Sequence, residues 1–565
     1  MSERATTPPS TLRQGAFDEE AYLRLYPDIA EAVRSGKSKS GAEHYQLYGK
    51  AEGRHYLGRS DPWTEVRIGP KAGFATEALA TPRHAVEALL LSEDGRLFVT
   101  GWADDSAAPL TALRLEGRGW VLSVRAEALA RHARADVQAA LGVAERRAFG
   151  FFGLLSAGAS LPASAECRCV LEWGSGQQAT ETVPARPSTA RDLRETVLGF
   201  IAGTGAGGAQ IQAMLSLDGA VGEQVIALNR AVTGAIVAAP FVERFGPQTR
   251  ALRGSIIVCL YGRPEYMFVQ NALFSGKPGI EDYEFVYVCN SPELLDRLLK
   301  EARSSALIYG LTQTVIGLPA NAGFGAANNL AAAQARSPRL LCVNPDVLPK
   351  DADWAARHTA ILDANGPGAR LFGSTLYYDD GSLMHGGMYL ELDTGLAVRS
   401  GGIEARRFAR VEHYGKGAPP DTAGFLRTRP VPAVSGAFIS VERDWFEALG
   451  GFCEDYVFGH YEDADLCLRS LEGGSPAWVQ DLRLWHLEGR GSVRRPVHEG
   501  ASLVNRWHFS RTWAERIAAD LCGSAPGRDL MLAAPPPPGP LPQGEGERKR
   551  LPPLAGGGWG RGVAA

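Results

Sequence analysis

The sequence lacks the features that mark several well-defined classes of protein. No stretch approaches about 18 consecutive apolar residues, so no segment predicts a membrane-spanning helix. The first residues carry no apolar core of a secretion signal, which predicts a cytoplasmic protein and leaves peripheral contact with a membrane open. A net charge of -4 and a pI near 6.3 provide no basic excess for phosphate backbones, so nucleic acid is not an expected partner. The oligomeric state stays open.

The cysteines also form no recognisable pattern. None of the eight belongs to a C-x-x-C pair, the spacing common in zinc sites and redox motifs. Four of them lie in or beside apolar runs that read as strands. We therefore expect buried thiols of a reducing compartment, and neither a disulfide framework nor a zinc site.

At 565 residues the chain is too long for one ordinary core, and its composition changes along its length. Both ends are polar or rich in Pro and Gly, which predicts disorder. The expected organisation is a disordered start (1–15), a small helical module (16–60), a β-sandwich-like accessory domain (63–187), a linker of two helices (190–248), an α/β domain (250–515) and a disordered tail (525–565).

Residues 63–187 contain many short β-prone runs separated by D-G, D-D and Gly-Ser turns. A β-sandwich is the simplest account, because short strands need a second layer to cover their apolar face. One helical insert is expected around residues 126–142. Trp102, Trp120 and Trp173 either line a sugar-binding face or, as is more common in a sandwich, fill the core.

Strand and helix patterns alternate from residue 252 onward. The continuous apolar runs S-I-I-V-C-L-Y (255–261) and Y-E-F-V-Y-V-C-N (283–290) are typical of strands covered on both faces. Alternation of this kind favours a wound α/β sheet, in which ligands bind beyond the carboxyl ends of the strands. We therefore expect Tyr261, Asn290, Asn321 and residues 344–346 to converge at that edge.

Three carboxylates crowd the sequence Y-E-D-A-D-L-C-L-R at 461–469. Glu462, Asp463 and Asp465 fall within four residues, and like charges so close are costly unless a cation, a proton or solvent relieves them. Apolar residues follow at once, so the cluster reads as the first turn of a helix, where carboxylates also suit the helix dipole. The pattern alone leaves two interpretations open, a functional site and an acidic surface turn.

Six ordered motifs carry a resemblance to a known family. They are N-A-G-F-G-A-A-N-N (321–329), L-L-C-V-N-P-D-V (340–347), V-S-G-A-F (434–438), G-G-F-C-E-D-Y (450–456), Y-E-D-A-D-L-C-L-R (461–469) and W-H (485–486). Together they resemble the family 2 glycosyltransferases, in particular the rhamnosyltransferase-like enzymes of bacterial polysaccharide assembly, and D-G-S-L-M-H-G-G (380–387) resembles a segment of that subset. Residues 17–54 resemble a small module attached to many polysaccharide-associated proteins, with either a docking or a structural role. The resemblance implies a GT-A fold for residues 250–515.

The resemblance also implies roles for individual residues. Asp346 and His486 would bind Mg²⁺ or Mn²⁺, and Asn344 would contact the nucleotide or its ribose. Asp463 would be the general base that takes the acceptor's proton, with Glu462 contacting the acceptor or tuning that base. A single base implies inversion. From its position two residues further on, Asp465 is expected to cap the helix.

The remaining predicted contacts surround the nucleotide sugar. Asn321, Gly323 and Asn329 resemble the loop that closes over the diphosphate, although Asn321 also fits a helix N-cap. Asn290 stands where many relatives have a base-reading aspartate, and Tyr261 follows the first strand. Arg490 either approaches the diphosphate or belongs to a solvated loop.

The resulting hypothesis is an inverting, metal-dependent transferase. It would move a sugar from dTDP-rhamnose or a UDP-sugar to a glycan or lipid-linked acceptor in bacterial surface polysaccharide synthesis. Two alternatives are kept, a non-catalytic carbohydrate-binding or scaffold protein on the same fold, and a nucleotidyltransferase.

Overall fold

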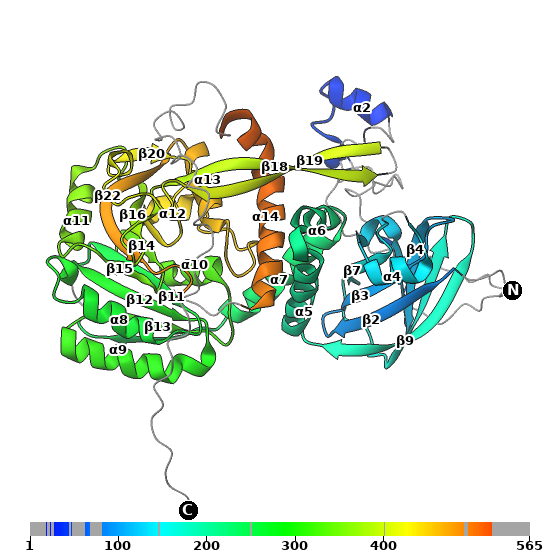
Figure 1. The fold of residues 1–565 in the computed structure, drawn as a ribbon, viewed down its shortest axis with the longest axis horizontal. Helices are drawn as coiled ribbons and strands as arrows, with labels where there is room; N and C mark the ends of the chain where they lie inside the picture. The colour runs from blue at the N-terminus through cyan, green and yellow to red at the C-terminus, as the bar shows by residue number, and fades with distance from the viewer. Residues whose placement is uncertain are drawn as a thin grey trace, which may run out of the picture. The chain divides into compact units, whose positions relative to one another are not determined.

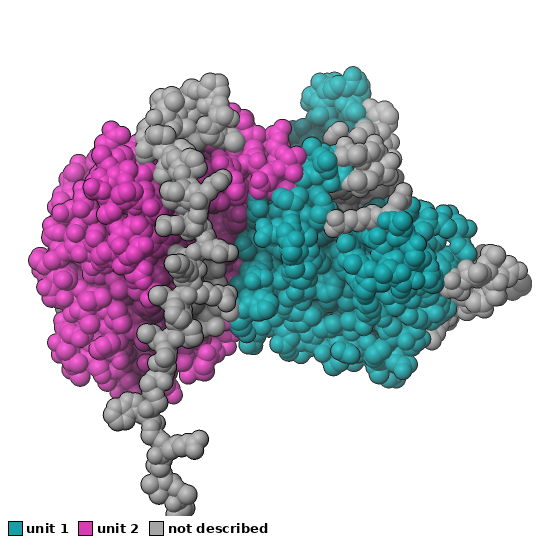
Figure 2. Space-filling model, in the orientation of Figure 1, with its two compact units in different colours: residues 1–232, 395–406, 495–508 teal, residues 233–394, 407–494, 509–565 magenta. Residues whose placement is uncertain are grey.

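The computed structural model describes residues 19, 23, 27–44, 47, 63–67, 82–144, 147–248, 251–399, 402–490 and 495–521. The chain forms two compact units, coloured separately in Figure 2. The first contains residues 1–232, 395–406 and 495–508, and the second contains residues 233–394, 407–494 and 509–565. The predicted disordered ends lie outside the described residues. Of the small helical module, the structure shows α2 (Pro27–Arg34) and α3 (Gly41–His44), and most of its other residues lie outside the described positions.

Among the described residues, the first unit contains a sheet of nine strands with the order β1-β5-β4-β8-β9-β2-β3-β7-β6. They are β1 (Trp63–Arg67), β2 (His84–Ser92), β3 (Arg96–Ala103), β4 (Leu110–Gly117), β5 (Trp120–Arg125), β6 (Ala130–His132), β7 (Gly150–Ser156), β8 (Glu166–Trp173) and β9 (Gln178–Ser188).

Strand β9 joins the two halves of this sheet. Its first part pairs antiparallel with β8, and its last four residues pair parallel with β2. Apolar side chains from both halves, such as Leu89 and Leu97 on one and Leu113 and Leu171 on the other, belong to a single buried cluster. The β-sandwich-like expectation is therefore confirmed.

The tryptophans of this unit settle the choice left open by the sequence for two of the three. Trp120 and Trp173 belong to the buried cluster, and their indole N–H groups donate to the carbonyls of Pro162 and Asp104. A buried indole with a satisfied N–H serves the core. Trp102 is half-buried.

Two local predictions need correction. The insert at 126–142 is not one helix, because a 3₁₀ turn η2 (Ala126–Ala128), the short strand β6 and α4 (Ala135–Leu141) share it. Residues 190–248 hold three α-helices and not two, namely α5 (Ala190–Thr204), α6 (Gln210–Leu217) and α7 (Val221–Val237). The glycine-rich stretch at 205–208, with positive φ at Gly207 and Gly208, ends the first of them.

The second unit contains an eleven-stranded sheet with the main order β10-β13-β12-β11-β14-β21-β16-β22-β15. Its strands are β10 (Phe241–Phe245), β11 (Gly254–Leu260), β12 (Tyr283–Cys289), β13 (Thr312–Gly317), β14 (Arg339–Val343), β15 (Val347–Pro349), β16 (Leu371–Tyr377), β17 (Leu383–His385), β20 (Arg429–Val431), β21 (Phe438–Glu442) and β22 (Ala477–His486). The strands β18 (Met388–Arg399) and β19 (Gly402–His413) form a separate ribbon.

Helices connect these strands (Figure 1). They are α8 (Glu265–Phe274), α9 (Leu295–Tyr309), α10 (Phe324–Gln334), α11 (Trp354–Ala364), α12 (Arg443–Ala448), α13 (Glu462–Glu472) and α14 (Pro496–Arg516), with short turns η4 (Ile280–Asp282), η5 (Pro292–Leu294), η6 (Ala423–Phe425) and η7 (Ile517–Leu521). Strands β11 to β14 are mutually parallel, so the predicted α/β domain is confirmed. The sheet is mixed, because β10 and β21 run antiparallel to their neighbours β13 and β14.

Most of the described thiols are buried, as the sequence predicts. Seven cysteines lie among the described residues, and all seven are free. Five of these are buried and two, Cys259 and Cys453, are partly exposed. None of the helices that the structure describes is long and apolar enough to span a bilayer.

Candidate functional site

The carboxyl edge of the parallel strands gathers most of the predicted site. Tyr261 and Asn344 are the first residues past the neighbouring strands β11 and β14, and Asn290 follows β12. Since β21 runs antiparallel to β14, with Phe438 opposite Val343, the V-S-G-A loop that precedes β21 lies at the same edge. The strand order 13-12-11-14 reverses between β11 and β14, and a reversal of this kind is where α/β sheets bind ligands.

Two of the predicted metal ligands lie together. Strand β15 pairs with β22, opposing Val347 to His486, and this pairing brings His486 Nε2 to 3.5 Å from Asp346 Oδ1. Both side chains are almost fully buried. The Nδ1 atom of His486 is buried without a hydrogen-bond partner among the described residues. Adjacent ligands of an octahedral ion lie about 3 Å apart, so a carboxylate and an imidazole at this separation fit one divalent cation.

The turn that carries Asp346 is held from both sides. Gln270 of α8, which is fully buried, donates from Nε2 to the carbonyls of Asn344 (2.9 Å) and Val347 (3.2 Å). The N–H of Asn344 donates to the carbonyl of Ala437 at 2.9 Å. The side chain of Asn344 itself is half-buried. Gln270 gave no signal in the sequence, because its role depends on a fold contact with residues more than seventy positions away.

The loop at 434–437 links this turn to the acidic helix. Asp463 lies at the start of α13, and its Oδ2 accepts the N–H of Gly436 at 2.7 Å while Oδ1 accepts the N–H of Ala464. Burial raises the pKa of Asp463, and these backbone donors oppose the rise. A carboxylate with two such bonds keeps lone pairs free for a substrate proton.

Glu462 has a different environment from Asp463. It is 5% exposed, and its Oε2 has no hydrogen-bond partner among the described residues. Burial, and then the nearby charges of Asp463 and Asp465, raises the pKa of Glu462 to about 8. Glu462 is therefore the neutral member of the pair at pH 7, and Asp463 is the group suited to carry the negative charge.

Asp465 does not cap the helix, contrary to the prediction. The residue in the N-cap position is Tyr461, which makes no side-chain cap bond, and the N–H of Asp465 itself donates to the Tyr461 carbonyl. Its carboxylate accepts from Arg469 Nε (2.8 Å) and from the indole of Trp513 (2.9 Å). It joins α13 to α14, so its role is structural, as expected, but through side chains.

An unusual backbone precedes Glu462. Three of the four non-glycine residues with positive φ among the described residues are Phe458 (59°), His460 (85°) and Tyr461 (77°). Residues held in this region cost about 1–3 kcal/mol each, and such residues gather at functional sites. The Phe458 carbonyl accepts the N–H of Phe324, so the strained turn is tied to the start of α10. The sequence F-G-H-Y carries no pattern that predicts this conformation.

The asparagines around α10 bond to the protein itself. Asn321 accepts the N–H of Gly323 at 2.8 Å, which is a turn before the helix and not an N-cap bond. Asn290 accepts the N–H of Ala322 and donates to the Gly323 carbonyl. Asn329 donates to the Phe452 carbonyl and accepts the Phe452 N–H, so it joins α10 to the G-G-F turn. Their proposed contacts with a ligand stay predictions.

Gly323 occupies a position that only glycine fits well. Its φ of 85° and ψ of −179° belong to a region that other residues avoid. A Cβ atom there would lie 2.9 Å from the Cα of Phe458. Close packing of α10 against the strained turn therefore requires this glycine, whether or not a ligand is bound.

Arg490 is the most exposed of the predicted residues. Its side chain is 64% exposed and pairs with Asp379 at 2.9 Å. Exposed ion pairs contribute little to stability, so this contact leaves the guanidinium free to change partners.

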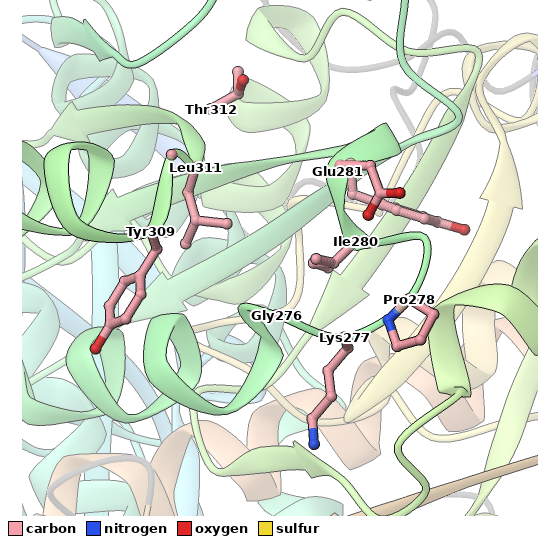
Figure 3. A pocket seen from close by; sticks show the side chains of 10 residues that line it. Gly276, Lys277, Pro278, Ile280, Glu281, Tyr309, Leu311 and Thr312 are labelled. Atoms are coloured by element: carbon pink, nitrogen blue, oxygen red, sulfur yellow. The ribbon is translucent and has the colours of Figure 1, made fainter.

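A cavity of about 350 Å³ lies elsewhere in the same unit (Figure 3). Lys277, Glu281 and Tyr309 line it, together with Tyr283 and Thr312 from the first positions of β12 and β13. It therefore opens at the amino ends of these strands, at the edge opposite the site described above.

Comparisons with known proteins complete the description. No family model matches the chain. Over 204 residues, 35% of this chain, it is 29% identical to a protein of Sinorhizobium fredii named "Uncharacterized protein y4gI", and the match covers 21% of that protein's length.

Two solved structures are similar at a distance. The structure of GalNAc-T7 with UDP, GalNAc and Mn²⁺ gives a TM-score of 0.34 at 15% identity, covering 47% of this chain and 50% of that one. The mannosyltransferase PcManGT from Pyrobaculum calidifontis, in complex with GDP-Man and Mn²⁺, gives 0.30 at 16% identity, covering 57% and 87%. Likenesses of this size assign no activity or ligand to this chain.

Proposed function

We propose that the second unit is an inverting glycosyltransferase of the GT-A type that uses a nucleoside-diphosphate sugar and a divalent cation. The observation that carries the proposal is the convergence of Asp346, His486 and Asp463 at one edge of the sheet. Asp346 and His486 lie 3.5 Å apart, and Asp463 is tied to the loop that also holds the Asp346 turn. Membership of family 2, and of its rhamnosyltransferase-like subset, belongs to the same proposal.

Asp346 and His486 would hold Mg²⁺ or Mn²⁺, which supplies positive charge to the departing diphosphate. Asp463 faces the acceptor. As the acceptor oxygen forms its bond to the anomeric carbon, the bond from that carbon to the diphosphate oxygen breaks, and the acceptor's proton passes to the Asp463 carboxylate. Attack from the side opposite the leaving group inverts the configuration.

Glu462 would assist from its neutral state. A protonated carboxyl beside a charged one adds no second negative charge to the site, and it can donate a hydrogen bond to an acceptor oxygen. In this pair Glu462 thus holds the proton and Asp463 holds the negative charge, as in other active sites where two neighbouring carboxyl groups have different roles.

The donor class, the acceptor and the biological setting extend the proposal. A dTDP- or UDP-sugar donor, a glycan or lipid-linked acceptor and a place in bacterial surface polysaccharide synthesis follow from the motifs in residues 321–486. Peripheral contact with the membrane would suit a lipid-linked acceptor.

The test is a donor screen with the full chain, using dTDP-rhamnose and common UDP-sugars with and without Mn²⁺. Release of a nucleoside diphosphate that requires Mn²⁺ is the expected result. Asp463→Asn should lower release at least 100-fold while Mn²⁺ binding persists, whereas Asp346→Ala should lose both. Glu472→Gln, on the last turn of the same helix, is the matched control.

Other outcomes would replace the proposal. Pyrophosphate release would identify a nucleotidyltransferase. Sugar binding without release from any donor would identify a carbohydrate-binding or scaffold protein. Release that is unchanged by chelation, or by Asp346→Ala, would remove the metal from the mechanism.

A further inference from the structure

Two histidines that the proposed chemistry does not use lie close to the site. His385 ends β17 and His413 ends β19, and their Nδ1 atoms are 2.9 Å apart. His385 is 1% exposed and His413 is half-buried. The two rings meet edge to face, with centroids 4.9 Å apart. A buried imidazole pair needs a definite arrangement of its protons, because each ring nitrogen either donates or accepts.

The backbone around His385 fixes this arrangement. Its Nε2 accepts the N–H of Gly387 at 3.2 Å and the N–H of Ser435 at 3.3 Å, so Nε2 carries no proton. The proton of the neutral ring is therefore on Nδ1, from which it is donated to Nδ1 of His413. Burial lowers the pKa of both rings, that of His413 to about 4, which agrees with a neutral pair.

The N–H that His385 accepts belongs to the Val434–Ser435 peptide, which adjoins the peptide that bonds to Asp463. The next N–H along the chain, that of Gly436, donates to Asp463 Oδ2 at 2.7 Å. The Ser435 side chain accepts the N–H of Ala437 and thereby tightens the same turn. The series from His413 through His385 to Asp463 thus consists of hydrogen bonds that are joined by the backbone of Ser435.

We propose that His385, held in one tautomer by the Gly387 and Ser435 N–H groups together with His413, is a positioning residue that fixes the backbone at Ser435 and, through the adjoining Gly436 N–H, the carboxylate of Asp463. The inference rests on the proposed role of Asp463 as the general base. It adds two residues from the D-G-S-L-M-H-G-G segment and the β18–β19 ribbon to the machinery of the reaction.

The effect on Asp463 has a definite sign. An N–H that donates to a carboxylate favours its charged form and lowers its pKa, so loosening the Gly436 peptide should raise the pKa of Asp463. The titratable groups of its own helix that interact with Asp463 are Glu462 and Cys467. From outside the helix, Asp463 accepts the N–H of Gly436, a peptide group that does not titrate.

The test compares three variants of the full chain with the wild type. His385→Leu keeps the volume and removes the acceptor, whereas His385→Gln keeps an acceptor oxygen for the Ser435 N–H. His413→Ala leaves the Nε2 acceptor in place but removes the group that accepts the Nδ1 proton. In His385→Leu, the acid limb of the pH profile of kcat should shift to higher pH by about one unit. On that limb kcat should be about tenfold below the wild-type value, and at high pH it should approach that value. His385→Gln should restore most of kcat, and His413→Ala should fall between the two.

Donor KM and Mn²⁺ affinity should stay within twofold of the wild type in all three variants, because both proposed metal ligands, Asp346 and His486, are unchanged and the histidine pair is neutral. A histidine that merely filled the core would lower kcat equally at all pH values, and Gln would not rescue it. That result, or an unmoved acid limb in both His385→Leu and His413→Ala, overturns the inference.

A second measurement separates this inference from the proposed function. Carbon NMR of protein labelled at aspartate carboxyls, with Asp463→Asn to assign the resonance, reports the pKa of Asp463 without turnover. A rise in His385→Leu of about one unit supports the hydrogen-bonded series even if no donor is cleaved, in which case the proposed function alone fails. If the wild type cleaves donor but the pKa of Asp463 is the same in His385→Leu as in the wild type, the inference alone is overturned.

Discussion

Replacing Glu462 by Gln should make the protein more stable, and increasingly so as the pH rises. The folded state raises the pKa of Glu462 from 4.5 to about 8, so between these values it holds a proton that the unfolded chain has released. Stability from this group is therefore complete below pH 4.5 and is lost as the pH rises to 8. At 1.36 kcal/mol per unit, the loss is about 3 kcal/mol by pH 7 and about 5 kcal/mol by pH 9.

Urea unfolding of the wild type and of Glu462→Gln at pH 5, 7 and 9 measures this effect. Gln cannot ionise, so the difference in free energy of unfolding between the two proteins should grow by about 2 kcal/mol or more from pH 5 to pH 7. Glu472→Gln, an exposed substitution on the same helix, should give a difference that does not change with pH. Parallel stability curves for the wild type and Glu462→Gln would show that Glu462 is ionised in the folded protein at pH 7.

Three further predictions test the packing and the ligand positions. Gly323→Ala should lower the free energy of unfolding by about 3 kcal/mol or more, since its Cβ would meet the Phe458 backbone at a positive φ. Gly310→Ala, which also has positive φ but open space around the Cβ, should lower it by about 1 kcal/mol. Equal losses of stability in thermal unfolding would refute this reasoning. His486→Ala should weaken Mn²⁺ binding at least tenfold by calorimetry, and unchanged binding would exclude His486 as a ligand. Asp465→Asn should lower the free energy of unfolding by about 2 kcal/mol, because a buried charge-assisted bond to Arg469 is lost, and a neutral effect would show that the α13–α14 link is unimportant.

The sequence predicts the elements whose information is local. The doubly covered strands β11 and β12 appear in the sequence as the continuous apolar runs 255–261 and 283–290, each within one residue of the observed strand. The proximity of Asp346 and His486 was expected only from the resemblance, because 140 positions separate them. The structure brings them to 3.5 Å through the β15–β22 pairing.

Other features depend on contacts that no local pattern records. Strand β9 contains Pro184 and Pro187, which normally argue against an internal strand, yet it pairs with β8 and then with β2. The sequence shows that the crowded carboxylates Glu462, Asp463 and Asp465 need relief from their repulsion. It does not show which of them is protonated. That division arises from burial, which leaves Glu462 Oε2 without a partner among the described residues and gives Asp463 two backbone donors.

The positive φ angles at Phe458, His460 and Tyr461 have a consequence for laboratory evolution. Glycine would adopt these conformations without strain, so a selection for heat resistance should accumulate glycine at these positions. The same substitutions would let the turn before Glu462 relax away from α10. We therefore expect the heat-resistant clones to lose turnover. Substitutions at this turn would raise stability and lower activity, whereas substitutions in the surrounding core would change both in the same direction.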